Sequence, residues 1–372
     1  MKILQIINAF ETGGAEKLLL DSIPVYRKLG IEMDVLLLWN NEHPFTKELQ
    51  ELNVCKIFIL HESVNKKDVY KLSNIPKIAA IIKSYDIAHV HLFPSQYFVV
   101  LANLINRNRT KLIFTEHNTS NKRIKNLLLR SLDKLIYRGY ERLVCISKEV
   151  ENIYKSYLKL PETFYITIWN GIDLRKIKEA KPFSKSDLEL NLKESDRLII
   201  QVSGFRPQKD QKTLIRSMKL LPERMKLILV GEGALKSECE QLVRDLNLEK
   251  RVLFLGQRMD VPQLLKTADF VVLSTHYEGL SLACVEGMAS GRPFLASDVV
   301  GVREVVRGAG ILFPCGDDYR LAEEILKLKN DTEYFNLTIR NSTLRAEQYD
   351  NLVMINKYVE LYNSIYESSF GS

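Results

Sequence analysis

Short apolar runs rich in β-branched residues alternate along the chain with longer amphipathic segments. Most runs are continuously apolar, which is typical of strands buried on both faces of a parallel sheet. They predict a first series of strands at residues 2–7, 33–38, 54–59, 87–91, 111–115, 142–146 and 164–168. A second series is predicted at residues 198–202, 225–230, 251–255, 270–273, 293–296 and 310–313. Helical patterns separate the strands, for example at 234–246 and 319–329, so we predict an α/β protein with two doubly wound domains.

The boundary between these domains is predicted at Asn170-Gly171-Ile172-Asp173, a turn signal followed by a polar, lysine-rich stretch. The first domain then comprises residues 1–170 and the second comprises residues 171–350. Residues 351–372 carry apolar side chains at helical spacing and are followed by no strand. We interpret this last segment as a helix that closes the first domain.

The composition of the 372 residues, 46% hydrophobic and 27% charged, is that of a soluble globular protein and excludes a disordered chain. No apolar run approaches the roughly 18 residues that span a bilayer, and residues 1–7 are interpreted as a strand rather than a signal peptide. The five cysteines form no CxxC pair, so neither a disulfide framework nor a zinc site is expected, and reduced thiols indicate a cytoplasmic protein. The net charge of +7 permits an anionic partner, but no nucleic-acid partner is predicted.

Four loops that directly follow predicted strands carry unusual residues, and in open parallel sheets ligands bind beyond the carboxyl ends of the strands. Gly13 and Gly14 follow the first strand, where paired glycines let a ligand approach the backbone and the next helix offers free N–H groups. A tight turn explains the same pair equally well. Arg206 and Lys209 follow strand 198–202, where they could hold a diphosphate or simply lie on a solvated loop.

The third loop contains Gly231 and Gly233, which allow close approach to a base or ribose, although a simple turn explains them almost as well. The fourth loop is the most informative, because Glu278 precedes a helix start at Gly279-Leu280-Ser281 whose free amides suit a phosphate. Glu286 follows about two helical turns later and therefore returns near the same face. Since the helix around Glu286 is apolar, its carboxylate needs a partner such as sugar hydroxyls; a surface glutamate is the alternative.

Glu278 and Glu286, with Gly279-Leu280-Ser281 between them, resemble the E-x7-E motif of retaining GT-B glycosyltransferases of the GT4 family. The resemblance covers nearly the whole chain in the family's order. Its other motifs are Thr12-Gly13-Gly14-Ala15-Glu16, Thr115-Glu116-His117, Cys145-Ile146-Ser147-Lys148, Asn170-Gly171-Ile172-Asp173 and Gly231-Glu232-Gly233. The resemblance implies a GT-B fold, in which two Rossmann-like domains face a central cleft. The N-terminal domain would hold the acceptor and the C-terminal domain the nucleotide-sugar.

The resemblance also implies roles for individual residues. Glu286 would bind the ribose hydroxyls, Glu278 would contact the transferred sugar, and Lys209 would neutralise the diphosphate. His117 would hold a phosphate or sugar hydroxyl, and Arg206 completes the predicted catalytic group. The other implied donor contacts are Gly204, Gly231, Gly233, Gly279, Leu280 and Ser281, and the implied acceptor or phosphate loop contains Gly13 and Gly14. The family is metal-independent, so the resemblance implies neither a metal nor a cofactor.

One departure from the family concerns the loop after strand 198–202. Many members have Gly-Arg there, with a lysine five residues beyond the arginine. In this chain the position holds Gly204, and the arginine is Arg206, three residues before Lys209. Either Arg206 reaches the same phosphates by another route, or Lys209 carries more of the charge.

Two further histidines, His89 and His91, end strand 87–91. We expect them to point to opposite sides of the strand, so that both cannot ligate one metal. His89 is interpreted as structural, and His117 is the better functional candidate because it follows the next strand.

Residues 121–140 combine six lysines and arginines with leucines and isoleucines at helical spacing. A basic amphipathic helix of this kind can lie on an anionic membrane surface. The alternative is an ordinary surface helix with a buried apolar face. Peripheral contact with the cytoplasmic membrane is therefore one of two open interpretations.

The resemblance, together with these loops, implies a retaining, metal-independent hexosyltransferase. It would move a sugar from a UDP- or GDP-sugar to a glycan or lipid-linked acceptor in bacterial surface polysaccharide biosynthesis. A nucleotide-sugar epimerase on the same scaffold and a non-catalytic nucleotide-sugar binder are the alternatives.

Overall fold

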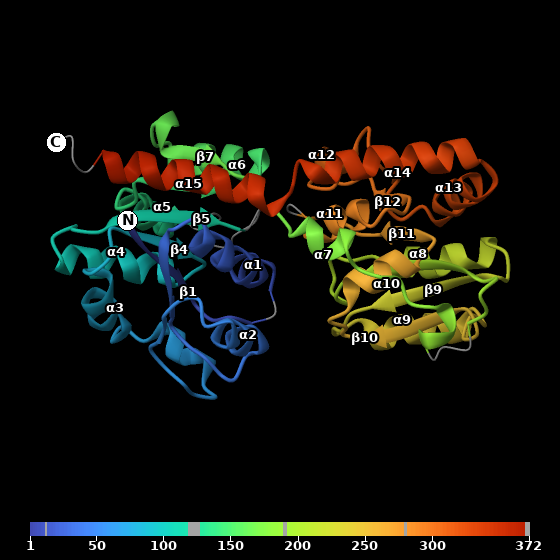
Figure 1. The fold of residues 1–372 in the computed structure, drawn as a ribbon, viewed down its shortest axis with the longest axis horizontal. Coiled ribbons are helices and arrows are strands. Elements are labelled where there is room, and N and C mark those ends of the chain that lie inside the picture. The colour runs from blue at the N-terminus through green and yellow to red at the C-terminus, as the bar shows by residue number, and fades with distance from the viewer. Residues whose placement is uncertain (12, 118–126, 189–191, 279–280, 369–372) are drawn as a thin grey trace. The chain divides into compact units, whose positions relative to one another are not determined.

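The computed structural model describes residues 1–11, 13–117, 127–188, 192–278 and 281–368. The chain divides into two compact units, one formed by Met1–Gly171 with Asn351–Ser372 and one by Ile172–Asp350 (Figure 1). Gly279, Leu280 and the predicted helical residues 121–126 lie outside the described residues.

The first unit is built on a seven-stranded parallel sheet with the order β3-β2-β1-β4-β5-β6-β7. Its strands are β1 (Lys2–Ile7), β2 (Glu32–Leu37), β3 (Ile57–Ile59), β4 (Ile87–His91), β5 (Lys111–Glu116), β6 (Arg142–Cys145) and β7 (Tyr165–Thr167). Its helices are α1 (Gly14–Lys28), α2 (Pro44–Leu52), α3 (Asn74–Ile82), α4 (Ser95–Ile105), α5 (Leu127–Tyr137), α6 (Lys148–Leu158) and α15 (Asn351–Glu367). The strand order reverses direction between β1 and β4, the arrangement at which ligands bind in doubly wound sheets.

The last helix, α15, is part of the core of this first unit although it is far away in the sequence. Ile355, Tyr358 and Tyr362 of α15 are buried in the same hydrophobic cluster as Ile3 of β1 and Leu19 of α1. Helices α1, α2 and α15 therefore cover one face of the sheet. The hydroxyl of Tyr362 also accepts a hydrogen bond of 3.2 Å from Gln5 Nε2. Polar as well as apolar contacts therefore hold α15 against the sheet.

The second unit is built on a six-stranded parallel sheet with the order β10-β9-β8-β11-β12-β13. Its strands are β8 (Arg197–Val202), β9 (Met225–Val230), β10 (Val252–Gly256), β11 (Phe270–Leu273), β12 (Phe294–Ser297) and β13 (Ile311–Phe313). Its helices are α7 (Leu174–Lys178), α8 (Gln211–Ser217), α9 (Lys236–Asp245), α10 (Val261–Thr267), α11 (Leu282–Ala289), α12 (Arg303–Val306), α13 (Asp318–Asn330) and α14 (Thr332–Glu347).

Side chains that alternate along the strands of this sheet enter two separate cores. Leu198 and Ile200 of β8 pack in one cluster with α7, α10, α11, α12 and the end of α14. Ile199, between them, packs on the opposite face with α8, α9 and α13. Burial on both faces explains why the strands are continuously apolar in the sequence. The predicted fold class, two Rossmann-like doubly wound domains of α/β type, is confirmed for both units.

Candidate active site

Two loops of the second unit bring Lys209 and Glu278 together as an ion pair. The loops follow β8 and β11, which are hydrogen-bonded neighbours in the sheet, and a β-bridge joins Lys209 to Thr275. His276 N donates to Gln208 O at 2.8 Å, which fixes one backbone against the other. Both charged side chains are largely shielded from water, with 15% of Lys209 and 12% of Glu278 exposed. The structure therefore places two of the predicted catalytic residues side by side, 69 positions apart in the sequence.

Thr275 and Gln201 hold this pair in place, and the sequence reasoning missed both. Thr275 Oγ1 contacts Glu278 Oε1 at 3.2 Å. Gln201 is buried in β8, where its Oε1 accepts from Ser274 N at 3.0 Å and its Nε2 donates to Ser274 O at 3.1 Å. A polar residue within the apolar strand Arg197–Val202 is the signal that could have identified Gln201, because a buried amide needs partners.

The two predicted cationic residues of the β8 loop differ in their surroundings. Arg206 is exposed and follows the turn at Gly204, whose carbonyl accepts from Arg206 N at 3.1 Å. Lys209 is the cation whose side chain is shielded and held by a carboxylate. Of the two, Lys209 is therefore the pre-positioned one.

Gly231 and Gly233 lie where the β9 loop passes closely over the β8 loop. Ser203 N donates to Val230 O at 2.9 Å and Phe205 N donates to Glu232 O at 3.1 Å. Gly231 has a φ of +139°, and a Cβ there would overlap the carbonyl oxygen of Ser203. Gly231 is therefore required because the β8 and β9 loops approach each other closely. This agrees with the alternative in which the glycines serve a turn and not a ligand contact.

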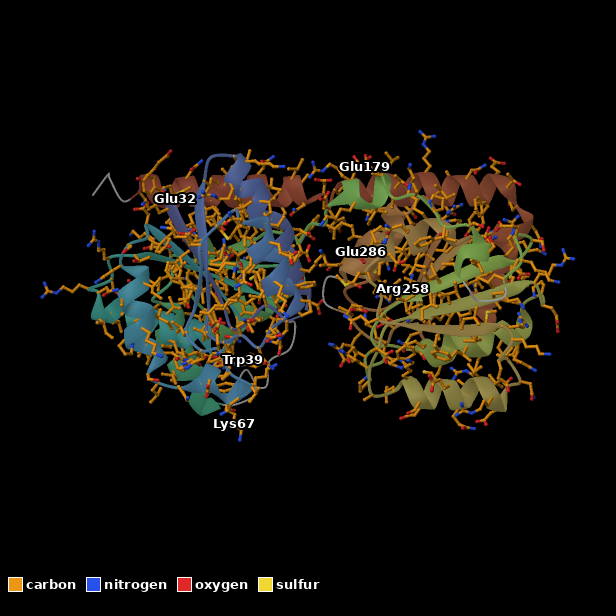
Figure 2. The ribbon with its side chains drawn as sticks, turned by 60° about the horizontal axis from the view of Figure 1, so that its bottom comes forward. Glu32, Trp39, Lys67, Glu179, Arg258 and Glu286 are labelled. Atoms are coloured by element: carbon orange, nitrogen blue, oxygen red, sulfur yellow. The ribbon has the colours of Figure 1, made fainter. Side chains whose placement is uncertain are left out.

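Glu286 lies on α11, which begins after Ser281 and is otherwise built into the core (Figure 2). Cys284, Val285 and Met288 of this helix are fully buried, whereas Glu286 is partly exposed. A short buried helix gives its one carboxylate a fixed position. Ser281 itself is buried, at the entry to α11.

In the first unit, a cavity of about 90 Å³ lies beyond the carboxyl ends of β1, β2 and β4. Its lining residues are Asn8, Ala9, Glu11, Glu16, Trp39, Lys66, Val69, Tyr70 and Leu92. Gly13 precedes α1, and a Cβ at this glycine would overlap the carboxylate of Glu16, so the predicted Gly13-Gly14 loop adjoins the cavity. Trp39 and Lys66 were not predicted as site residues, although Trp39 directly follows a strand region.

The expectation that His89 and His91 point to opposite sides of β4 is wrong. Their ring centroids are 4.3 Å apart, because residues i and i+2 of a strand lie on the same face. His91 Nδ1 lies 3.0 Å from His117 Nε2, and His89 contacts the hydroxyl oxygens of Tyr362 and Thr115, each at 2.7 Å. The three rings form a buried row that includes the predicted site residue His117.

Burial lowers the pKa of all three histidines. The pKa of His89 falls to about 3, that of His117 to about 4, and that of His91 falls well below its usual value. His117 is therefore a neutral imidazole at physiological pH, one nitrogen of which faces His91. It can hold a hydroxyl or a phosphate oxygen by a hydrogen bond but brings no positive charge.

The histidine row predicts that the first unit loses stability as the pH falls from about 6.5 toward 4. In this range the unfolded chain binds protons at histidines with the ordinary pKa of about 6.5, while the folded chain does not. Both tryptophans, Trp39 and Trp169, lie in this unit, so urea unfolding followed by tryptophan fluorescence measures it selectively. The free energy of unfolding should depend less on pH in the H117N variant. A wild-type free energy of unfolding that does not change between pH 7.5 and 5 would contradict the prediction.

Two family profiles together match most of the chain. Glycosyltransferase Family 4 matches residues 12–176, and Glycosyl transferases group 1 matches residues 183–345. The chain belongs to the GT4 family of glycosyltransferases. The family predicted from the motifs is thereby confirmed. Nearly all of the first match lies in the first unit, and the second match lies wholly in the second unit.

This GT4 glycosyltransferase has relatives with different acceptors in their names. It is 29% identical over 314 residues to N-acetyl-alpha-D-glucosaminyl L-malate synthase of Bacillus anthracis, covering 82% of this chain and 81% of that protein. It is 26% identical over 356 residues to UDP-Gal:alpha-D-GlcNAc-diphosphoundecaprenol alpha-1,3-galactosyltransferase of Escherichia coli, covering 89% of each. The crystal structure of Anabaena Alr3699/HepE in complex with UDP has a TM-score of 0.82 at 23% identity, covering 98% of this chain and 100% of that chain, and shares the fold.

Proposed function

We propose that this glycosyltransferase moves a sugar, with retention of anomeric configuration, from a UDP- or GDP-sugar to a glycan or lipid-linked acceptor. The observation that carries the proposal is the shielded Lys209–Glu278 pair at the carboxyl end of the second sheet. The name of the Escherichia coli relative, which specifies UDP-Gal and a diphosphoundecaprenol-linked sugar, supports this donor and acceptor class. The malate acceptor named for the Bacillus anthracis relative is the reason to test small hydroxy acids as well.

In the proposed reaction the second unit binds the donor. Lys209 faces the diphosphate and neutralises the charge that grows as the sugar departs, which is the main electrostatic demand of the step. Glu278 contacts the sugar and, through its ion pair, orients Lys209. Glu286 binds the ribose hydroxyls, and the acceptor enters from the first unit, where the cavity beside Trp39 adjoins the Gly13-Gly14 loop. The leaving phosphate accepts the acceptor proton on the same face of the sugar.

The decisive experiment measures nucleoside diphosphate release from a panel of nucleotide-sugars with and without acceptors. Thermal shift with UDP, GDP and ADP first selects the base, because a ligand that binds the folded state raises the melting temperature. Release that depends on an added glycan, lipid-linked sugar or hydroxy acid supports the proposal. A rearranged nucleotide-sugar without acceptor would instead indicate an epimerase, and binding without any turnover would indicate a non-catalytic protein.

We expect turnover to persist in excess EDTA and to be independent of added Mg²⁺ or Mn²⁺. In this proposal Lys209 supplies the positive charge that a metal provides at the diphosphate of other transferases. The measurement is the initial rate at 25 °C with and without chelator. Complete loss of activity that Mg²⁺ or Mn²⁺ restores would contradict the metal-free mechanism.

We also propose that the first unit binds an anionic membrane surface on the cytoplasmic side. None of the described helices is long and apolar enough to cross a membrane. Within α5, Leu132 and Leu135 are exposed, the latter at 65%, next to the cations Arg130, Lys134 and Arg138. Helix α4 contacts α5 and exposes Leu104 and Ile105. Exposed apolar side chains among cations favour the membrane interpretation over a helix whose apolar face is fully buried.

Co-sedimentation with vesicles tests the membrane proposal. The wild-type chain should bind phosphatidylglycerol vesicles more strongly than phosphatidylcholine vesicles, and L132S/L135S should reduce this binding. The matched control is L337S/L344S, which replaces two leucines of similar mean exposure on α14 in the other unit. Equal binding by both double variants would contradict the assignment of this surface.

A further inference from the structure

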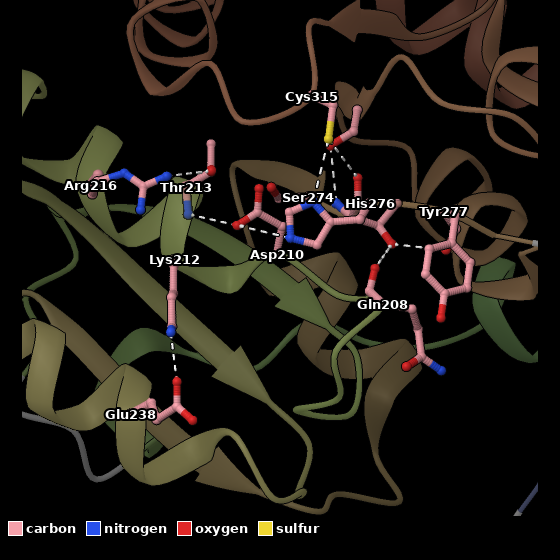
Figure 3. A network of polar contacts seen from close by, with 12 residues as sticks. Gln208, Asp210, Lys212, Thr213, Arg216, Glu238, Ser274, His276, Tyr277 and Cys315 are labelled. Carbon is pink, nitrogen blue, oxygen red and sulfur yellow. Dashed lines mark hydrogen bonds and ion pairs between the residues drawn. The ribbon is translucent and has the colours of Figure 1, made fainter.

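Three side chains that could ligate a metal ion meet in the second unit, on the loops next to the ion pair of Lys209. They are Asp210, His276 and Cys315, and one ligand atom of each lies within 4.8 Å of the other two (Figure 3). His276 Nδ1 is 3.5 Å from Cys315 Sγ, and His276 Nε2 is 4.0 Å from Asp210 Oδ1. The residues are 66 and 39 positions apart, so their spacing in the sequence carries no metal-binding signal.

The carboxylate of Asp210 is incompletely satisfied by the protein. Asp210 is only 5% exposed, and its Oδ1 accepts a hydrogen bond of 3.2 Å from Thr213 N at the start of α8. Its Oδ2 is buried and has no hydrogen-bond partner within the described part of the chain. A buried anionic oxygen without a partner costs free energy, which a bound cation would offset. Burial and the negative charge of Asp210 also raise the pKa of the neighbouring Cys315 thiol, and a bound cation would counteract the effect of that charge.

We propose that Asp210, His276 and Cys315 bind one thiophilic divalent cation such as Zn²⁺, with water in the fourth position. Carboxylate, imidazole and thiolate are the ligands that zinc prefers, whereas Mg²⁺ and Ca²⁺ require mainly oxygen. The thiol proton of Cys315 is released to solvent when the Cys315 thiolate binds the metal.

The geometry needs only a small adjustment to accept the cation. Ligand atoms of a tetrahedral zinc, at bond lengths of about 2.0–2.3 Å, lie roughly 3.3–3.8 Å from one another. Starting from separations of at most 4.8 Å, the ligands must close by about 1 Å. The side chain of His276 is 48% exposed and Cys315 is also exposed, so both can turn, while Asp210 stays fixed at the start of α8.

The site would join the loops that carry the catalytic pair. Asp210 directly follows Lys209, and His276 lies between Thr275 and Glu278. Cys315 comes from the loop after β13 and its Sγ lies 3.6 Å from Thr275 O. A cation here stabilises the relative positions of these three loops without replacing the charge of Lys209. Its removal should therefore lower the melting temperature but leave turnover at 25 °C in place.

The proposal is tested by metal binding alone, with tag-free full-length protein reduced by a phosphine. Titration with Co²⁺ should reach one ion per chain with a thiolate-to-cobalt charge-transfer absorption, which Zn²⁺ should abolish by displacement. At free Zn²⁺ about one hundred times its Kd, the melting temperature should rise by roughly 5–10 °C. The variants C315S and H276A should lose the absorption and the temperature shift. The matched control C55S, which removes a half-buried thiol in the first unit, should keep both.

The proposal is wrong if C315S keeps the cobalt absorption and the shift in melting temperature, or if the wild-type chain shows neither. The three side chains would then be a hydrogen-bonded cluster that binds no metal. H276A provides the second, independent ligand test if C315S is poorly folded. None of these measurements involves a nucleotide-sugar, so their failure is distinguishable from failure of the proposed glycosyl transfer.

Discussion

Replacement of Lys209 by alanine is expected to lower kcat about 100- to 1000-fold. The charge on the diphosphate grows as the sugar departs, so a fixed cation at this position acts mainly in the transition state. Loss of one such contact costs about 2.7–4 kcal/mol. The structure strengthens this expectation, because Lys209 is shielded from water and already held by Glu278. Steady-state kinetics with saturating acceptor measure the effect.

The matched control is the R206A variant, which removes the other cation of the same loop. Arg206 is exposed, and an exposed ionic contact contributes only ~0–1 kcal/mol, so its loss should change kcat by no more than about fivefold. The folded state of both variants is checked by thermal unfolding, since K209A leaves Glu278 without its ion-pair partner. If R206A is the more damaging variant, Arg206 has taken over the phosphate contact and the assignment of Lys209 is wrong.

Replacement of Glu286 by alanine is expected to weaken nucleoside diphosphate binding about 10- to 150-fold while the fold persists. A hydrogen bond made by a charged group contributes about 1.5–3 kcal/mol. Glu286 is a partly exposed carboxylate on the otherwise buried helix α11, so its truncation removes a ligand contact and little core packing. Calorimetric titration with the diphosphate of the preferred base measures the change in Kd.

The control for this prediction is E304A, which truncates an exposed glutamate on α12 of the same unit. Its affinity for the nucleoside diphosphate should equal that of the wild-type chain. A folded E286A variant with unchanged affinity would remove Glu286 from the donor site and would place the ribose elsewhere along the sheet edge.

Several features of the site became visible only in the folded chain. Gln201 and Thr275 hold the loops of Lys209 and Glu278, yet neither belongs to a motif that marks a ligand site. Trp39 and Lys66 line the cavity of the first unit because the turns after two adjacent strands meet there. His89 and His91 were predicted on opposite sides of β4, but they lie on the same side. This error was avoidable from the sequence, because side chains two residues apart in a strand point to the same face.

The sequence by itself determined the two parallel sheets, the loops that carry Lys209 and Glu278, and the family. A continuously apolar strand is stable only when helices cover both faces of its sheet. In such sheets the loops that bind ligands follow the carboxyl ends of the strands. Only the tertiary structure decided which of these loops touch. The strand order β8-β11 makes neighbours of residues 69 positions apart. The loop after the edge strand β13 adds Cys315 to Asp210 and His276, so that one ligand atom of each lies within 4.8 Å of the other two. Local patterns encode the burial of each strand, whereas contacts between loops depend on how the whole sheet is ordered, and no short segment carries that information.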